Sequence, residues 1–130
     1  MMARVALAAV ALLATACTSP VSTGDRKAEA DACAQLALTA ANSVSELAFA
    51  RIERMKVMRF ASEEAMKAYT DETERLQMEA IRLDNINVSL SKRYGMPGIE
   101  LDPGLTEDPT DESAAAAIAA ADACAAPLLT

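Results

Sequence analysis

The fold is decided by one stretch, Asp25–Arg93, which reads DRKAEADACAQLALTAANSVSELAFARIERMKVMRFASEEAMKAYTDETERLQMEAIRLDNINVSLSKR. No glycine or proline occurs within it, and Gly24 and Gly95 bound it on either side. The stretch is dense in Ala, Glu, Arg, Leu and Met, the residues that lose least free energy on entering a helix. A single helix of this length would extend roughly 100 Å and would need a partner along its whole apolar side. We therefore predict an antiparallel helical hairpin.

Ser62 marks the best position for the turn of this hairpin. Its hydroxyl can cap the start of a second helix, and the two glutamates that follow it place negative charge in the first turn, where the helix dipole favours it. This turn predicts helices over residues 26–60 and 62–94, two arms of about 50 Å each. A rival turn lies at residues 69–73, where a threonine or an aspartate would provide the cap.

Apolar side chains recur at helical spacing in both arms. The first arm carries a stripe of mostly small residues at Cys33, Ala37, Ala40, Val44 and Leu47. The second arm carries larger residues every seven positions, at Tyr69, Leu76, Leu83 and Leu90. Two helices packed on each other within one chain bury both stripes. A homodimeric coiled coil is the alternative that the same spacing allows.

The chain changes character after the hairpin. Residues 95–110 contain two Pro-Gly dipeptides, in which proline presets the first turn position and glycine accepts a positive φ at the second. We predict a strap here, followed by a third helix over residues 111–125 that Thr110 or Asp111 caps and Pro127 ends. Small residues form one stripe on that helix, at Ala114, Ala117, Ala121 and Cys124.

Geometry brings two cysteines of this fold together. If the hairpin turns near Ser62, the second arm returns to the level of Cys33, and the strap lets the third helix climb back beside it. Cys124 then meets Cys33 between two stripes of small residues, which let the α-carbons approach to about 5.5 Å as a disulfide requires. We predict this disulfide, which closes residues 25–130 into a single all-α domain.

Residues 1–16 have the pattern of an export signal peptide. Arg4 supplies the positive start, and residues 5–14 form a short apolar run that ends in small side chains. About ten to twelve apolar residues are too few to cross a bilayer core of roughly 30 Å, so we predict no membrane span in this segment.

Residues 14–16 (Ala-Thr-Ala), followed by Cys17, resemble the lipobox of bacterial lipoproteins. The resemblance covers only the first 17 residues, and it implies that Cys17 is acylated and becomes the mature N-terminus. The Thr and Ser after this cysteine do not look like an inner-membrane retention signal, so the resemblance points to the outer membrane. Ordinary cleavage after residue 16 is the alternative and would give a soluble secreted protein. In both cases residues 17–24 form a short tether.

Cysteine counting favours the lipoprotein interpretation. The chain has three cysteines, and a spare exposed thiol is a liability in an oxidising compartment. If Cys17 carries lipid, Cys33 and Cys124 remain as a pair.

Composition limits the function classes. The formal net charge of −7 disfavours general nucleic-acid binding, since such proteins cluster Lys and Arg against phosphates. The chain has no histidine, the commonest general base and a frequent zinc ligand, so histidine-dependent triads and most zinc sites are excluded. We expect no catalytic residue, no resident metal or cofactor, and no nucleic-acid partner.

Basic and methionine side chains gather at the distal end of the hairpin. We predict that an envelope protein partner binds this group, which we call the basic tip: Arg51, Arg54, Met55, Lys56, Met58 and Arg59. Methionine surfaces adapt to varied targets, and clustered positive charge selects an acidic or amphipathic one. The alternative is that the charges form a solvated face and the methionines fill gaps.

Two weaker cation patterns are present. Met55 and Met58 have the spacing of half a thioether site for cuprous copper, but the ligand set is incomplete without histidine or an exposed cysteine. The acidic residues of the strap do not match the spacing of an EF-hand loop. Neither pattern predicts a metal site.

These features together favour a non-enzymatic role. Small helical lipoproteins of this general plan include secretion-system pilotins and other assembly accessories, which is an analogy of fold without a matching motif. We expect a structural or protein-interaction module of the cell envelope, with the basic tip or an exposed flank of the hairpin as its partner surface. The alternative is a small-ligand or metal-binding periplasmic helical module, which an apolar cavity between the arms would favour.

Overall fold

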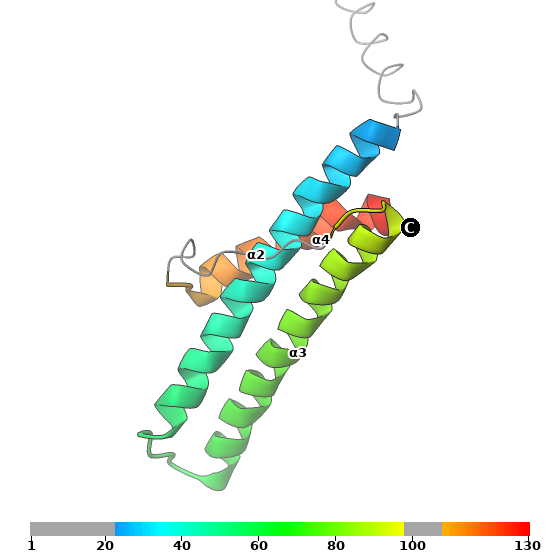
Figure 1. Ribbon diagram of the computed structural model, residues 1–130. Helices are drawn as coiled ribbons and strands as arrows, with labels where there is room; N and C mark the ends of the chain where they lie inside the picture. Colours follow the sequence, from blue (N-terminus) through cyan, green and yellow to red (C-terminus); the bar gives the residue numbers. More distant parts are fainter. Residues whose placement is uncertain (1–22, 98–107) are drawn as a thin grey trace, which may run out of the picture.

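The computed structural model describes residues 23–97 and 108–130. The signal peptide, Cys17, nearly all of the tether and most of the strap lie outside the described residues. Every regular element within them is a helix, which confirms the all-α fold class. The helices are α2 (Thr23–Met55), α3 (Glu63–Arg93) and α4 (Asp111–Leu129), shown in Figure 1.

The long helices α2 and α3 run antiparallel as a hairpin, and α4 crosses behind α2 in the view of Figure 1. The turn lies where Ser62 predicts it. The Ser62 hydroxyl accepts a hydrogen bond from the Ala65 N–H at 3.1 Å, so it caps α3. The rival turn at residues 69–73 is wrong, because these residues lie inside α3.

The first arm is shorter than predicted, since α2 ends at Met55 and not at residue 60. Beyond it, the N–H groups of Val57 and Met58 both donate to the Arg54 carbonyl oxygen, at 3.1 and 3.0 Å, and the helical ladder stops. Packed helix axes lie about 8–10 Å apart, so a chain that reverses direction needs several non-helical residues to cross between them. Residues 56–62 make this crossing.

Small residues on α2 form the centre of the core. The predicted stripes are confirmed, since Cys33, Ala37, Ala40, Val44, Leu76, Leu83 and Leu90 are all buried. Leu47 and Tyr69, at the distal ends of the stripes, are half-buried. Alanines on α2 let two neighbours approach closely, so α3 and α4 both pack against it. The result is a thin core with few large side chains.

The third helix begins at the predicted cap. The Thr110 hydroxyl accepts from the Ser113 N–H at 3.0 Å, and the Ser113 hydroxyl accepts from the Thr110 N–H at 2.8 Å, which completes a capping box. The prediction that Pro127 ends this helix is wrong, because α4 continues to Leu129. Leu128 is buried with Ala30 and Leu90, and its carbonyl oxygen accepts the Tyr94 hydroxyl at 3.0 Å. These contacts hold the last turn despite the proline.

The second arm ends where the strap was predicted to start. Gly95 adopts a φ of +64°, and the Met96 N–H donates to the Ser91 carbonyl oxygen at 2.8 Å. This is the bond that closes a Schellman motif, in which glycine takes the left-handed position at no steric cost.

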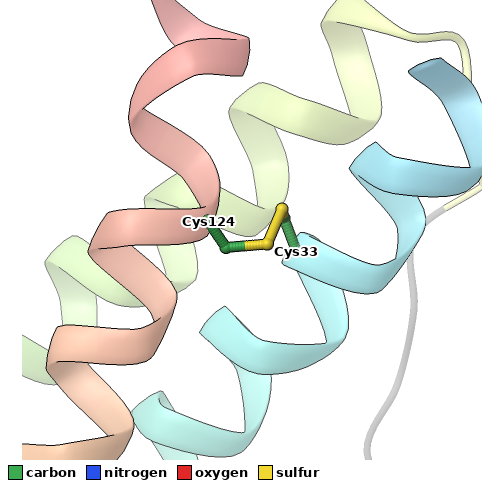
Figure 2. The surroundings of a disulfide bond; sticks show 2 residues. All are labelled: Cys33 and Cys124. Atoms are coloured by element: carbon green, nitrogen blue, oxygen red, sulfur yellow. A yellow bond between two sulfur atoms is a disulfide. The ribbon is translucent and has the colours of Figure 1, made fainter. Parts of the chain in front are cut away.

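The predicted disulfide is confirmed. Cys33 of α2 and Cys124 of α4 are bonded (Figure 2); their α-carbons are 5.4 Å apart, and they are separated by 91 positions in the sequence. The bond fixes α4 to the half of α2 that is nearer to Thr23, the first residue of that helix. Among the described residues, α4 is also the one helix long and apolar enough to cross a membrane by length and composition.

Candidate interaction surfaces

The structure divides the basic tip into two parts. Arg51 turns toward α3, where its Nε donates to Thr73 Oγ1 at 3.0 Å and its Nη2 donates to the Tyr69 carbonyl oxygen at 3.2 Å. Its guanidinium carbon lies 3.9 Å from the centroid of the Tyr69 ring. Arg51 therefore joins the two arms of the hairpin, and its charge is less available to a partner than the sequence pattern indicated.

The other basic residues of the tip point into solvent. Arg54 and Arg59 are exposed and form no ion pair within the described residues, whereas Lys56 pairs with Glu53 of the preceding turn at 2.9 Å. Met58 is 38% exposed and Met55 is half-buried. Arg54, Lys56, Arg59 and Met58 thus remain at this end as the accessible part of the predicted surface, and Lys56 shares its charge with Glu53.

A charged network covers the junction of α3 with α4. Arg82 donates to both carboxylate oxygens of Asp122, at 2.7 and 3.0 Å, and it also bonds Glu79 one turn before it. The hydrogen bonds from Arg82 lower the pKa of Glu79, and the two carboxylates raise the pKa of Arg82. Two acids therefore hold one arginine, which orients α4 on the hairpin.

An apolar groove runs along the opposite side of the hairpin. It encloses about 820 Å³, and its described lining comes from α2 and α3 alone: Leu38, Ala41, Asn42, Ser45, Ala48, Phe49, Ile52, Glu74, Gln77, Met78, Ala80, Ile81 and Asp84. A separate depression next to α4 is lined by other faces of the same two helices, including Leu47 and Leu76. We call the first feature the α2–α3 groove.

The walls of the α2–α3 groove are large apolar side chains that remain in contact with solvent. Phe49, Met78 and Ile81 are 64%, 65% and 54% exposed, respectively. Alanines form its floor, because Ala48 and Ala80 are buried between the two helices. Clusters of exposed large apolar residues on a small protein mark interaction sites more often than isolated ones do.

The charge of the α2–α3 groove is negative. Glu74 and Asp84 line it, both exposed, and no lysine or arginine is among the described residues of its lining. Neither carboxylate forms a salt bridge in the described part of the chain, in contrast with Glu72 and Glu79 on the α4 side of α3. The groove thus offers an apolar channel with two accessible acids.

A small pocket lies near the open end of the hairpin. It encloses about 210 Å³ between Asn87, Val88, Ser91, Lys92 and Met96. Asn87 and Ser91 are only 5% and 9% exposed, and neither Asn87 Oδ1 nor Ser91 Oγ has a hydrogen-bond partner among the described residues. Buried polar atoms without partners cost stability, so Asn87 and Ser91 are a weak point of α3.

The sequence analysis named an exposed flank of the hairpin and an apolar cavity between the arms in general terms, but it did not identify the residues of the α2–α3 groove. The sequence signal for this groove is a second apolar stripe beside each packing seam, at Phe49 and Ile52 in the first arm and at Met78 and Ile81 in the second.

No cluster of three or more His, Cys, Asp or Glu side chains able to hold a metal occurs in the parts of the chain that the structure describes. A scan against protein-family models found no matching family, and searches of curated proteins and of solved structures found no similar chain.

Proposed function

We propose that this protein is a non-enzymatic lipoprotein of the cell envelope that acts as a protein-interaction module, in the manner of a pilotin or another assembly accessory. The observation that carries the proposal is the α2–α3 groove, a channel with solvent-exposed apolar walls on a hairpin that a disulfide braces from the other side. Grooves between paired helices are a recurring way to bind a segment of another protein.

Cysteine usage supports the tether. Of the three cysteines, Cys33 and Cys124 are bonded to each other, which leaves Cys17 for acylation. Because α2 begins at Thr23, the groove starts roughly 20 Å and the tip lies roughly 50 Å along the helix from its first residue. With a lipid on Cys17, the helix is long enough to carry both surfaces away from the anchored end, and the proposed outer-membrane anchor would place them in the periplasm.

The test of the lipid tether is to isolate the protein from cell envelopes, alkylate its free thiols without reducing its disulfide, and measure its intact mass. We expect a chain that begins at Cys17 with added acyl mass and no alkylated thiol. A chain of unmodified mass with one alkylated cysteine would indicate a secreted soluble protein and would overturn the lipoprotein assignment.

The interaction role is tested by placing a photo-crosslinking amino acid at single exposed positions in the intact cell. Met78 reports on the α2–α3 groove and Arg59 reports on the basic tip, while Ala116 on the exposed side of α4 is the matched control. We expect one envelope protein to crosslink from Met78 or Arg59 and not from Ala116. Equal crosslinking from all three positions, or none from any, would contradict the proposal.

A small-ligand module is the second candidate, because the volume of the groove is within the range of small-molecule sites. Such sites enclose most of their ligand, whereas Phe49 and Met78 are both more than half exposed. A rise in melting temperature with one small apolar compound, absent for its close analogues, would favour this candidate.

A further inference from the structure

We propose that the α2–α3 groove receives an amphipathic, basic helix of the partner protein, and that Glu74 and Asp84 pair with two lysines or arginines of that helix. The inference rests on the proposed function and specifies the chemistry of the partner segment. It concerns the groove, not the basic tip.

The shape of the groove suits a helix. The groove follows α2 from Leu38 to Ile52, which is about 21 Å at 1.5 Å per residue, the length of about four helical turns. Its floor of alanines lets a third backbone come close, and its walls come from both arms. Since α4 occupies one side of the hairpin, a helix in the groove would complete a four-helix arrangement.

The apolar walls specify the anchors of the partner. Phe49 and Ile52 face the groove from α2, and Met78 and Ile81 face it from α3. A helix between them presents apolar side chains at positions i, i+4, i+7 and i+11 on one face. Methionine is flexible and polarizable, so Met78 can adjust to the shape of these anchors.

The two acids specify the charge of the partner and its spacing. Glu74 and Asp84 are ten residues apart on α3, which places them about 15 Å apart along its axis. A bound helix would pair with both carboxylates if it carried two basic side chains ten or eleven residues apart. Because no basic residue is among the described lining, these carboxylates have no competing partner inside the groove.

Two other occupants fit the charge less well. A second copy of this chain would bring Glu74 and Asp84 of both copies into one interface, and each copy carries a net charge of −7. Residues 98–107 of the same chain contain three acids, no base and a proline. Both occupants would add negative charge to a negative groove.

The test uses the mature full-length chain and two synthetic 18-residue helical peptides as probes. Both peptides carry leucines at i, i+4, i+7 and i+11, and they differ only at two flanking positions ten residues apart, which are lysine in one and glutamate in the other. Fluorescence anisotropy of labelled peptide measures affinity at low and high salt. We expect the lysine peptide to bind about tenfold more tightly than the glutamate peptide, with the difference reduced by salt.

Paired variants distinguish the effect of the two carboxylates in the groove from the effect of the net charge of the protein. Glu74→Lys with Asp84→Lys should weaken the lysine peptide about tenfold and strengthen the glutamate peptide. Glu29→Lys with Glu112→Lys makes the same change in net charge at exposed positions outside the groove and should leave the preference intact. Ile81→Asp should abolish binding of both peptides, while Val57→Asp at the exposed turn should not. Circular dichroism verifies that each variant remains helical.

Equal affinity for the two peptides, or no effect of the Glu74 and Asp84 reversal, would overturn the inference. A concentration-dependent dimer that Ile81→Asp dissociates would overturn it in favour of a second copy in the groove. Crosslinking in cells from Met78 to a segment without basic residues would overturn the inference while the proposed function stands. Absence of crosslinks from both Met78 and Arg59 would overturn the inference and the proposed function together.

Discussion

Arg51 of α2 and Tyr69 of α3 contact each other across the hairpin through reciprocal hydrogen bonds and a cation–π contact. The guanidinium of Arg51 lies over the Tyr69 ring and donates to the Tyr69 carbonyl oxygen, while the Tyr69 hydroxyl donates back to the Arg51 carbonyl oxygen at 3.1 Å. Phe60 of the turn packs against the same ring, with 5.5 Å between the ring centroids. The distal end of a thin, alanine-rich core is thereby closed by polar and aromatic contacts in place of large aliphatic side chains.

Arg51→Ala should destabilise the protein by about 1 to 3 kcal/mol, because it removes a cation–π contact and two hydrogen bonds at a half-buried position. Urea denaturation measures the change. Arg54→Ala is the matched control, since Arg54 is exposed in the last turn of the same helix, and it should change stability by less than about 0.5 kcal/mol. Equal effects of the two variants would contradict the assignment of Arg51 to the hairpin contact.

Removal of the disulfide by Cys33→Ala with Cys124→Ala should cost about 4 to 5 kcal/mol, since the bond closes a loop between cysteines that are 91 positions apart in the sequence. α4 should exchange its amide hydrogens first, because α2 and α3 retain their mutual packing. Hydrogen exchange resolved by helix provides the measurement, with Cys17→Ser as the control that leaves the bond intact. Equal protection of all three helices in the double variant would show that the bond does not hold α4.

Acid should weaken the ion pair that Glu79 and Arg82 form within α3. Arg82 lowers the native-state pKa of Glu79 below its usual value of about 4.3, so the folded protein favours the carboxylate. The resulting stabilisation is fully present above about pH 4.3 and is lost as the pH falls through the lower native-state pKa. Glu79→Gln should therefore cost about 0.5 to 1 kcal/mol at pH 7 and nothing near pH 2.

Chemical denaturation across pH 2 to 7 measures this difference. Glu74→Gln is the control, because its carboxylate forms no salt bridge in the described part of the chain. A gap between wild type and Glu79→Gln that stays constant with pH would disprove the role of the Arg82 pair.

Asn87→Leu should stabilise the protein by about 1 kcal/mol. The Asn87 side chain is buried on α3, and its Oδ1 has no partner among the described residues, so leucine removes a desolvation penalty at similar volume. Thermal and urea denaturation measure the gain. Asn85→Leu, at an exposed position of the same helix, should give none. A loss of stability in Asn87→Leu would show that the native environment satisfies the amide.

Local signals predicted the elements well. The absence of glycine and proline over Asp25–Arg93 predicted long helices, and Ser62 predicted the turn, because capping and helix propensity depend on residues within a few positions. The cysteine pair was also predictable. Once a hairpin and a returning helix are assumed, the lengths of the elements leave one level at which Cys33 and Cys124 can meet.

Local signals failed where distant contacts outweigh them. Pro127 should have ended α4, but Leu128 is anchored by side chains from α2 and α3, and this packing offsets the missing backbone hydrogen bond. Arg51 was grouped with the solvent-facing cations of the tip by its neighbours in the sequence. A long side chain can turn toward any surface within its reach. The ring and the carbonyl oxygen of Tyr69 determine that the Arg51 side chain turns toward α3.

The sequence by itself determined the helices, the position of the turn, the two packing seams and the disulfide, since each depends on local propensity, periodicity or chain length. Only the tertiary structure decided that α4 covers one side of the hairpin and leaves Phe49, Met78 and Ile81 open on the other. The physical reason is that periodicity identifies an apolar face but not the element that covers it. Which face remains open depends on the position of α4, and the Cys33–Cys124 bond and the Arg82–Asp122 pair hold that position.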